Sequence, residues 1–296
     1  MRIGYFGDGP WAHNALKKII EDPMIDVVFV MPRYDSQDKV LIQIAEENKI
    51  PVEIWSNINT DEFLNHIEQY NVELFVSMSF NQIFKKKTFT YPPLKTINCH
   101  AGKLPFYRGR NILNWVLIND EKEYGITVHY VDEGIDTGDI ILQRTYSITD
   151  NDDYSTLLSR AYIDCAEILY ESIKLIQDDK VKLIKQNTID KFGLYCGIRQ
   201  FGDEIIDWNQ SSREIFNFVR AICKPGPMAT SYINKKEIKI NKVRLIPEAH
   251  TYKNIPGQVL GKTRDGFLIK TKDTVIEVIE YNYNGKIKVG DRLKNE

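Results

Sequence analysis

The chain has 296 residues, of which 43% are hydrophobic and 27% charged, and its formal net charge is -2 at pH 7. This length and composition are typical of a soluble globular protein with two domains, and the near balance of charges argues against a general affinity for nucleic acid or anionic membranes. Its four cysteines lie far apart and no apolar run is long enough to span a bilayer, so we expect a reduced, cytoplasmic protein without a metal site.

The first predicted element is a buried strand, Arg2–Phe6, followed by the turn Gly7–Ala12 and a helix. The turn matches G-x-G-x-x-A, a dinucleotide-binding pattern, and makes an NAD-dependent oxidoreductase one hypothesis. Such a site also needs an acid at the end of the second strand, yet the predicted strand Val27–Met31 runs into Pro32-Arg33. The hypothesis is weakened but not excluded, and a tight strand-to-helix turn without a ligand stays open as an alternative.

Strands and helices alternate along the following segments. Helical spacing of apolar residues predicts helices at Leu41–Glu47 and Asp61–Gln69, and short apolar runs predict strands at Pro51–Ile54 and Leu74–Met78. This alternation predicts an α/β fold with a Rossmann-like, doubly wound and mostly parallel sheet.

The segment from Asn98 to Gly138 holds the densest group of polar and conformationally special residues. Lys95–Ile97 is predicted to be a short strand that delivers Asn98, Cys99 and His100 at its C-terminal end, where sites form in open α/β sheets. Because side chains alternate along a strand, Asn98 and His100 should share one face and Cys99 the other.

Asp136 lies in the turn Gly134–Gly138, which follows the predicted strand Ile126–Val131. The flanking glycines allow a tight backbone that carries the carboxylate close to a neighbouring strand end. Residue chemistry alone leaves a structural reading open, since Asn98 can cap a turn and Asp136 can form an ordinary Asx-turn.

The segment reads N-C-H-A-G-K-L-P-F-Y-R-G, and later G-I-T-V-H-Y-V-D-E-G-I-D-T-G. This order resembles the signature of the folate-dependent formyltransferases, which act on methionyl-tRNA, glycinamide ribonucleotide or nucleotide-linked amino sugars. The resemblance implies that Asn98, His100 and Asp136 are the catalytic trio and that 10-formyltetrahydrofolate donates the formyl group, with no metal required.

The chemistry of these side chains agrees with that role. Formyl transfer to an amine passes through a tetrahedral oxyanion, which an amide donor such as Asn98 can stabilise. His100 can donate to the oxyanion or move the proton, and Asp136 within hydrogen-bond reach would fix the tautomer of His100.

The resemblance also implies binding residues. The folate contacts carried over are Gln82, Ile83, Phe84, Arg110, Asp132, Glu133, Gly134 and Ile135. The acceptor contacts carried over are Gly9, Pro10, Trp11 and Arg199. Apolar packing of Ile83 and Phe84 on the sheet is an equally compatible reading.

The C-terminal part of the chain changes in character. A long amphipathic helix is predicted at Asp153–Gln177, and after it a helix at Ser211–Ile222 precedes a series of short strands separated by turns. We expect a catalytic domain at residues 1–191 and a small OB-like β-barrel at residues 192–296. By resemblance to two-domain members, a homodimer is expected.

Two features bear on the acceptor. Members that act on tRNA carry a basic, glycine-containing insertion after the second strand, and this chain lacks one. Tyr107–Asn119 resembles the formyltransferase of UDP-4-amino-4-deoxy-L-arabinose and its relatives for dideoxy amino sugars. We therefore expect transfer to the 4-amine of a UDP- or dTDP-linked amino sugar for surface glycan biosynthesis, without a nucleic-acid or membrane partner.

Two alternatives to this acceptor stay open. The lysines Lys235, Lys236, Lys239 and Lys242 form a modest basic group that keeps methionyl-tRNA as an acceptor. A sensor that binds both ligands without turnover is the other alternative, which the intact trio argues against.

Overall fold

The computed structural model describes residues 1–295, and the chain divides into two compact units. The first unit consists of residues 1–109, 124–146 and 159–196, and the remaining segments form the second. The chain thus passes between the units several times before residue 197.

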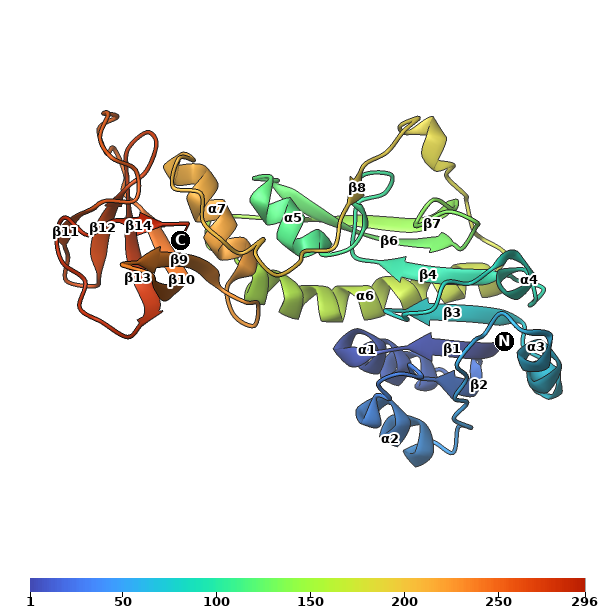
Figure 1. Cartoon of the computed structure of the whole chain (residues 1–296). Helices are drawn as coiled ribbons and strands as arrows, with labels where there is room; N and C mark the ends of the chain where they lie inside the picture. The colour runs from blue at the N-terminus through green and yellow to red at the C-terminus, as the bar shows by residue number, and fades with distance from the viewer. Residues whose placement is uncertain (296) are drawn as a thin grey trace. The chain divides into compact units, whose positions relative to one another are not determined.

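The first unit is built on a six-stranded sheet with the order β2-β1-β3-β4-β6-β7 (Figure 1). The strands are β1 (Arg2–Gly7), β2 (Asp26–Met31), β3 (Leu74–Met78), β4 (Thr96–His100), β6 (Glu123–Tyr130) and β7 (Ile140–Ser147). β1 to β4 are parallel, whereas β6 runs antiparallel to β4. The predicted Rossmann-like, mostly parallel sheet is confirmed.

The strand predicted at Pro51–Ile54 is reduced to a single parallel bridge between Val52 and Val30. The carbonyl oxygen of Pro51 accepts a hydrogen bond from the backbone N–H of Val30. Proline has no N–H of its own, so the pairing does not extend.

Helices cover both faces of the sheet. They are α1 (Gly9–Ile20), α2 (Lys39–Glu47), α3 (Asp61–Ile67), α4 (Lys86–Phe89) and the long α6 (Tyr154–Gln177). α1 packs beside α6, where the rings of Trp11 and Tyr162 meet edge to face at 4.6 Å. α3 covers the opposite face, begins at an N-cap where Thr60 accepts from the backbone of Phe63, and buries Phe63 against β1. No helix among residues 1–295 is both long and apolar enough to cross a membrane.

An aromatic cluster holds the α3 side of the sheet together. Phe6 of β1 is fully buried, and its ring meets those of Phe29, Phe63, Phe75, Phe80 and Phe84 at centroid distances of 5.0 to 6.4 Å. These edge-to-face contacts add to the hydrophobic effect of burial. The cluster therefore fixes the loop after β3 at the carboxyl edge of the sheet.

The second unit contains α5 (Ile112–Ile118), α7 (Ser212–Ile222) and an antiparallel sheet with the order β11-β12-β13-β10-β9-β14. The strands are β9 (Ala229–Ile233), β10 (Lys236–Leu245), β11 (Val259–Lys262), β12 (Phe267–Lys270), β13 (Val275–Tyr283) and β14 (Leu293–Lys294). Backbone bonds from Val259 to Asp291 and from Leu293 to Gly257, both 2.8 Å, join the two edges of the sheet. The predicted small barrel is confirmed, and α7 starts at a capping box formed by Ser211 and Glu214.

The aromatic cluster makes a prediction about stability. Phe6→Ala should lower the free energy of unfolding by about 3 to 5 kcal/mol, because it leaves a cavity among five other rings. Urea denaturation measures the difference. The matched control is Phe201→Ala, which removes a ring that is 99% exposed and should change stability by less than about 0.5 kcal/mol. Equal effects of the two substitutions would contradict this account.

Candidate functional site

Strand β4 presents Asn98 and His100 on one face of the sheet, as the alternation of side chains predicts. Cys99 lies on the opposite face, where its thiol reaches the carbonyl of Cys165 on α6 at 3.8 Å. His100 is buried and Asn98 is partly exposed. The amide and the imidazole are thus separated from the thiol, as expected.

A second histidine, which sequence reasoning missed, joins this face. β6 pairs with β4 in a register that sets His129 opposite Asn98 and Thr127 opposite His100. Residues directly opposite in an antiparallel pair point to the same side of the sheet. The amide nitrogen of Asn98 lies 3.4 Å from Nε2 of His129. The signal in the sequence was the alternation of polar Thr127 and His129 with apolar neighbours along I-T-V-H-Y.

Asp136 comes from the turn after β6 and meets both histidines. Its Oδ2 lies 3.6 Å from Nδ1 of His100, and its Oδ1 lies 3.5 Å from Nε2 of His129. Oδ2 also accepts a 2.9 Å hydrogen bond from the backbone N–H of Gly109. The structure therefore brings Asn98, His100 and Asp136 together and adds His129.

The electrostatic state of Asp136 follows from these neighbours. Burial by itself raises the pKa of Asp136, but the charges of His100 and His129 and the N–H of Gly109 outweigh it and hold the pKa well below its ordinary value. The site therefore contains a carboxylate that stays ionised at neutral pH beside two imidazole rings.

The ring of His100 is held from its other side as well. Nε2 donates to the carbonyl oxygen of Tyr107 at 2.7 Å. Gly102 packs directly on the ring, because a Cβ built there would lie 2.5 Å from Nε2. Thr127 fixes this loop by donating its hydroxyl to the carbonyl of Gly102 at 2.7 Å. A side chain at position 102 would displace the imidazole.

The residues expected near folate after β3 have mixed environments. Gln82 bridges to a neighbouring loop by accepting from Ile58 at 3.0 Å and donating to Trp55 at 2.8 Å. Phe84 is buried in the aromatic cluster, whereas Ile83 is 68% exposed. Of the two apolar side chains, Ile83 and Phe84, a ligand can therefore reach that of Ile83.

The turn that carries Asp136 is ordered by its own side chains. Oδ1 of Asp132 accepts from the backbone of Gly134 at 3.1 Å and from the hydroxyl of Thr137 at 2.5 Å. Glu133 is exposed and pairs with Lys86 at 3.3 Å, and Ile135 is 47% exposed.

The first turn after β1 lies at the carboxyl edge of the same parallel strands as β4. The backbone N–H of Gly9, which has a φ of +72°, donates to Oδ2 of Asp38 at 2.7 Å. Pro10 is exposed, and Trp11 packs on Tyr162. Gly9, Pro10 and Trp11, which we expected to contact the acceptor, therefore lie at the same edge of the sheet as the end of β4. Asp38 holds their turn in place.

Two arginines expected to bind ligands belong to the second unit. Arg110 is exposed at the start of that unit. Arg199 lies over the rings of Trp115 and Phe218 at 5.6 and 5.5 Å, and its backbone N–H donates to Asn111 at 2.9 Å. Arg199 thus also packs on aromatic rings within the second unit.

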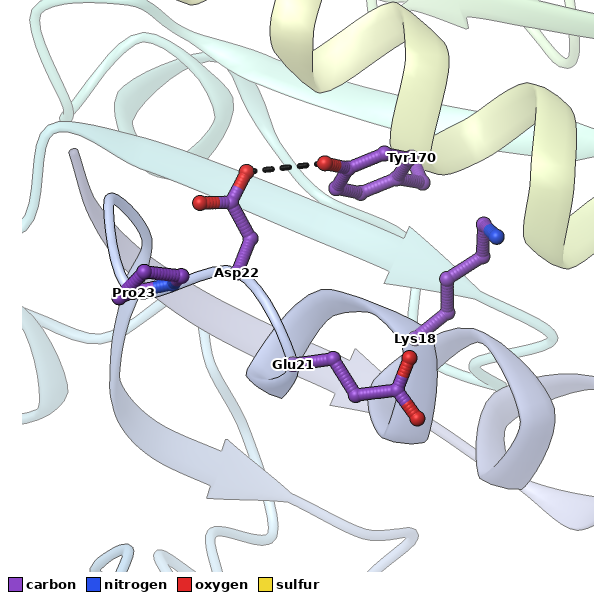
Figure 2. A pocket seen from close by; sticks show the side chains of 5 residues that line it. All are labelled: Lys18, Glu21, Asp22, Pro23 and Tyr170. Carbon is purple, nitrogen blue, oxygen red and sulfur yellow. Dashed lines mark hydrogen bonds between the residues drawn. The ribbon is translucent and has the colours of Figure 1, made fainter.

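A pocket elsewhere in the first unit is separate from the trio. Figure 2 shows a pocket at the C-terminal end of α1, lined by Lys18, Glu21, Asp22, Pro23 and Tyr170. The Tyr170 hydroxyl donates to Asp22 at 2.9 Å. Lys174 of α6 donates to the same carboxylate. The hydrogen bonds from Lys174 and Tyr170 lower the pKa of Asp22 to about 2. These groups bind one another, and the pocket carries none of the expected site residues.

The arrangement at β4 and β6 suits group transfer at a carbonyl carbon. It offers an amide N–H and an imidazole as donors beside an ionised carboxylate, which are the components needed to stabilise an oxyanion and move a proton. Within residues 1–295 no group of three or more His, Cys, Asp or Glu side chains is arranged to hold a metal ion.

Comparison with known families identifies the class. Residues 1–173 match the family model described as formyl transferase, and residues 200–291 match formyl transferase, C-terminal domain. The chain therefore belongs to the formyl transferase family, which confirms the family and the enzyme class predicted from the Asn98–Gly138 motif.

Individual relatives point to two kinds of acceptor. A methionyl-tRNA formyltransferase of Caldanaerobacter subterraneus subsp. tengcongensis is 32% identical over 303 residues, covering 99% of this chain and 95% of that protein. WlaRD, a sugar 3N-formyl transferase solved in the presence of dTDP and 5-N-formyl-THF, is 27% identical with a TM-score of 0.69, covering 97% of this chain and 99% of its own. An N-formyltransferase of Helicobacter canadensis, solved with folinic acid and dTDP-3-aminofucose, is 26% identical with a TM-score of 0.68, and the match covers 94% of this chain and 99% of that one.

The lowered pKa of Asp136 makes a prediction about stability and pH. A carboxyl whose folded pKa lies below its unfolded value, about 3.9, stabilises the fold above that pH and loses the effect as the pH falls toward the folded pKa. Asp136→Asn should therefore cost about 1.5 to 3 kcal/mol of unfolding free energy at neutral pH. Denaturation of both proteins from pH 7 to about pH 3 should show the gap narrowing in acid. A gap that widens in acid would refute the assignment.

Proposed function

We propose that the chain transfers a formyl group from 10-formyltetrahydrofolate to the amine of a nucleotide-linked amino sugar. The observation that carries the proposal is the joint placement of Asn98, His100 and Asp136 in a chain of the formyl transferase family. The two sugar formyltransferases described above match nearly the full length of this chain. Both were solved with a formyl-folate compound and with either dTDP or a dTDP-linked sugar.

In this proposal Asn98 binds the oxyanion. The folate supplies the formyl group, and attack of the acceptor amine on its carbon leaves negative charge on the formyl oxygen. The Asn98 amide makes a contact of 3.4 Å to His129, which is long for a hydrogen bond, so its N–H groups are available to that oxygen. A preorganised donor of this kind contributes about 3 to 4 kcal/mol to lowering the barrier.

His100 and Asp136 handle charge and protons. When His100 is protonated, Nε2 donates to Tyr107 and Nδ1 faces the carboxylate of Asp136. In this role the His100 ring exchanges a proton between the attacking amine and the departing folate nitrogen. The Asp136 carboxylate, which lies 3.6 Å from Nδ1, holds the orientation of the ring during transfer.

Binding residues follow the same assignment. We assign the folate contacts to Gln82, Ile83, Arg110 and the turn from Asp132 to Ile135, and to the backbone of Phe84, whose ring is buried. We assign the acceptor contacts to the first turn, Gly9, Pro10 and Trp11, and to Arg199. The exposed side chains of Ile83 and Ile135 support the folate assignment, because a ligand can cover them.

The connection from β2 to α2 supports a small acceptor. It comprises residues 32–38, too short for a separate grip on tRNA. Arg33 lies 3.6 Å from Asp8 and 2.8 Å from Asp35, and Asp38 lies beside the same turn. Burial raises the pKa of Asp8, and the neighbouring Asp38 and Asp35 raise it against the opposing charge of Arg33. Arg33, the basic residue of this connection, is therefore already paired with carboxylates, and the connection offers no cluster of basic side chains of the kind that holds a nucleic acid.

Methionyl-tRNA is the second candidate acceptor, because the relative from Caldanaerobacter matches at higher identity than either sugar enzyme. In that case the basic grip lies outside the connection from β2 to α2. The lysines of the barrel, Lys235, Lys236, Lys239 and Lys242, are the candidates for it.

Formyl transfer against a panel of acceptors tests the proposal. The panel contains UDP- and dTDP-linked sugars with the amine at position 3 or 4, and methionyl initiator tRNA. We expect turnover on a nucleotide sugar, with an amine at position 4 as the first choice, and none on tRNA. Turnover on tRNA alone, with a steep dependence on salt, would replace the proposed acceptor by the second candidate.

The roles of the trio predict the effect of truncation. Asn98→Ala should lower kcat by about 10²- to 10³-fold and His100→Ala by about 10²- to 10⁴-fold, with the fold retained. Matched controls are Asn254→Ala and His250→Ala, which alter exposed residues of the second unit and should keep normal turnover. Circular dichroism verifies folding, and near-normal kcat in either trio variant would exclude its assigned role.

A further inference from the structure

The segment that follows α6 returns to the trio. It lies between the stretches that match the two family models, residues 1–173 and 200–291. It contains the short 3-10 helix Gln186–Thr188 and the strand β8 (Tyr195–Cys196). β8 pairs in parallel with β5 (Arg108–Gly109), whose Gly109 holds the carboxylate of Asp136.

Gln186 is the residue of this segment that reaches the Asp136 turn. It is 3% exposed, and its Nε2 donates to the carbonyl oxygens of Asp136 at 2.9 Å and Gly138 at 2.8 Å. Its Oε1 accepts from Nε and Nη2 of Arg108 at 3.0 and 2.6 Å. Both N–H groups and both lone pairs of one amide are thereby used.

Arg108 is itself buried and fixed. Its Nη1 donates to the carbonyl of Phe192 and to the hydroxyl of Tyr195, both at 3.3 Å, and its guanidinium lies 5.3 Å from the Tyr195 ring centre. A guanidinium hydrogen-bonded to an amide oxygen polarises the amide and strengthens the bonds that its N–H groups make. Arg108 therefore reinforces the grip of Gln186 on the turn.

The turn needs such a grip. Asp136 has a φ of 54°, in the left-handed region that costs a residue with a side chain free energy. Strained conformations persist only where the surroundings fix them. Gly109 fixes the carboxylate of Asp136, and Gln186 fixes the carbonyls at Asp136 and two residues later.

We infer that Gln186, backed by Arg108, is a positioning residue that holds the Asp136 carboxylate toward His100 for formyl transfer. The inference rests on the role of Asp136 in the proposed function. It assigns catalytic importance to a segment outside both family-model matches. In this assignment Gln186 contacts neither the acceptor amine nor the formyl group. It acts by holding the turn that carries Asp136.

Gln186→Glu separates positioning from simple structural support. The carboxylate keeps the shape of the side chain and pairs with Arg108, but it replaces the two donors by an acceptor facing the carbonyls of Asp136 and Gly138. We expect kcat to fall by at least about tenfold while KM for folate and acceptor changes by less than about threefold, because misplacement of a catalytic group affects the chemical step. The matched control is Gln69→Glu, an exposed glutamine of the same unit, which should retain normal kcat.

Hydrogen exchange supplies a readout that needs no acceptor. Amides of residues 132–138 should exchange faster in Gln186→Glu than in the unmodified protein, whereas those of the β1 core should not. If Gln186→Glu fails to fold, Arg108→Lys takes its place, since lysine keeps the charge but loses the paired bonds to Oε1. The same changes in kcat and exchange are then expected.

The outcomes distinguish the two proposals. Normal kcat in a folded Gln186→Glu variant, or a loss explained by KM alone, would overturn the positioning role. If the unmodified protein formylates no acceptor in the panel, the proposed acceptor is wrong and hydrogen exchange alone tests the inference. Faster exchange of residues 132–138 in Gln186→Glu then supports the inference, and unchanged exchange overturns it.

Discussion

A buried carboxylate in a strained turn is the constraint on which the site depends. The Asp136 side chain is 13% exposed and its backbone is left-handed, two conditions that each cost free energy. They persist because hydrogen bonds and charges converge on it from β4, β5, β6 and the segment after α6. β4, β5, β6 and the segment after α6 are therefore all tied to this one residue, and the sheet supplies the rigid base for the arrangement.

Local patterns were sufficient for the elements and for part of the site. The alternation along β4 placed Asn98 and His100 together, and the glycines around Asp136 marked its tight turn. The helix predicted at Ser211–Ile222 is present as α7, which begins at a capping box of Ser211 and Glu214. These features depend on neighbours in sequence, which is why one sequence was enough to predict them. The binding residues in the second unit rest on the resemblance.

Features that depend on register or on distant segments were not predictable in the same way. His129 reaches the trio only because β6 pairs with β4 in one register, and a shift of one residue would turn its ring to the other face. Gln186 lies in a stretch without periodicity, and the short strands β5, β8 and β14 are too brief for a pattern. The strand expected at Pro51–Ile54 was wrong for a different reason: the prediction followed the apolar run and did not take account of the N–H that proline lacks.

The interleaving of the two units has a consequence for how the protein is made and how it can evolve. As the chain leaves the ribosome, residues 1–109 appear before the strand β6 that pairs with β4, so the hydrogen-bonding edge of β4 stays open while 110–123 are synthesised. The site is complete only after residue 186 has emerged. Because each unit is assembled from several separate segments, a recombination event with one crossover cannot exchange either unit whole.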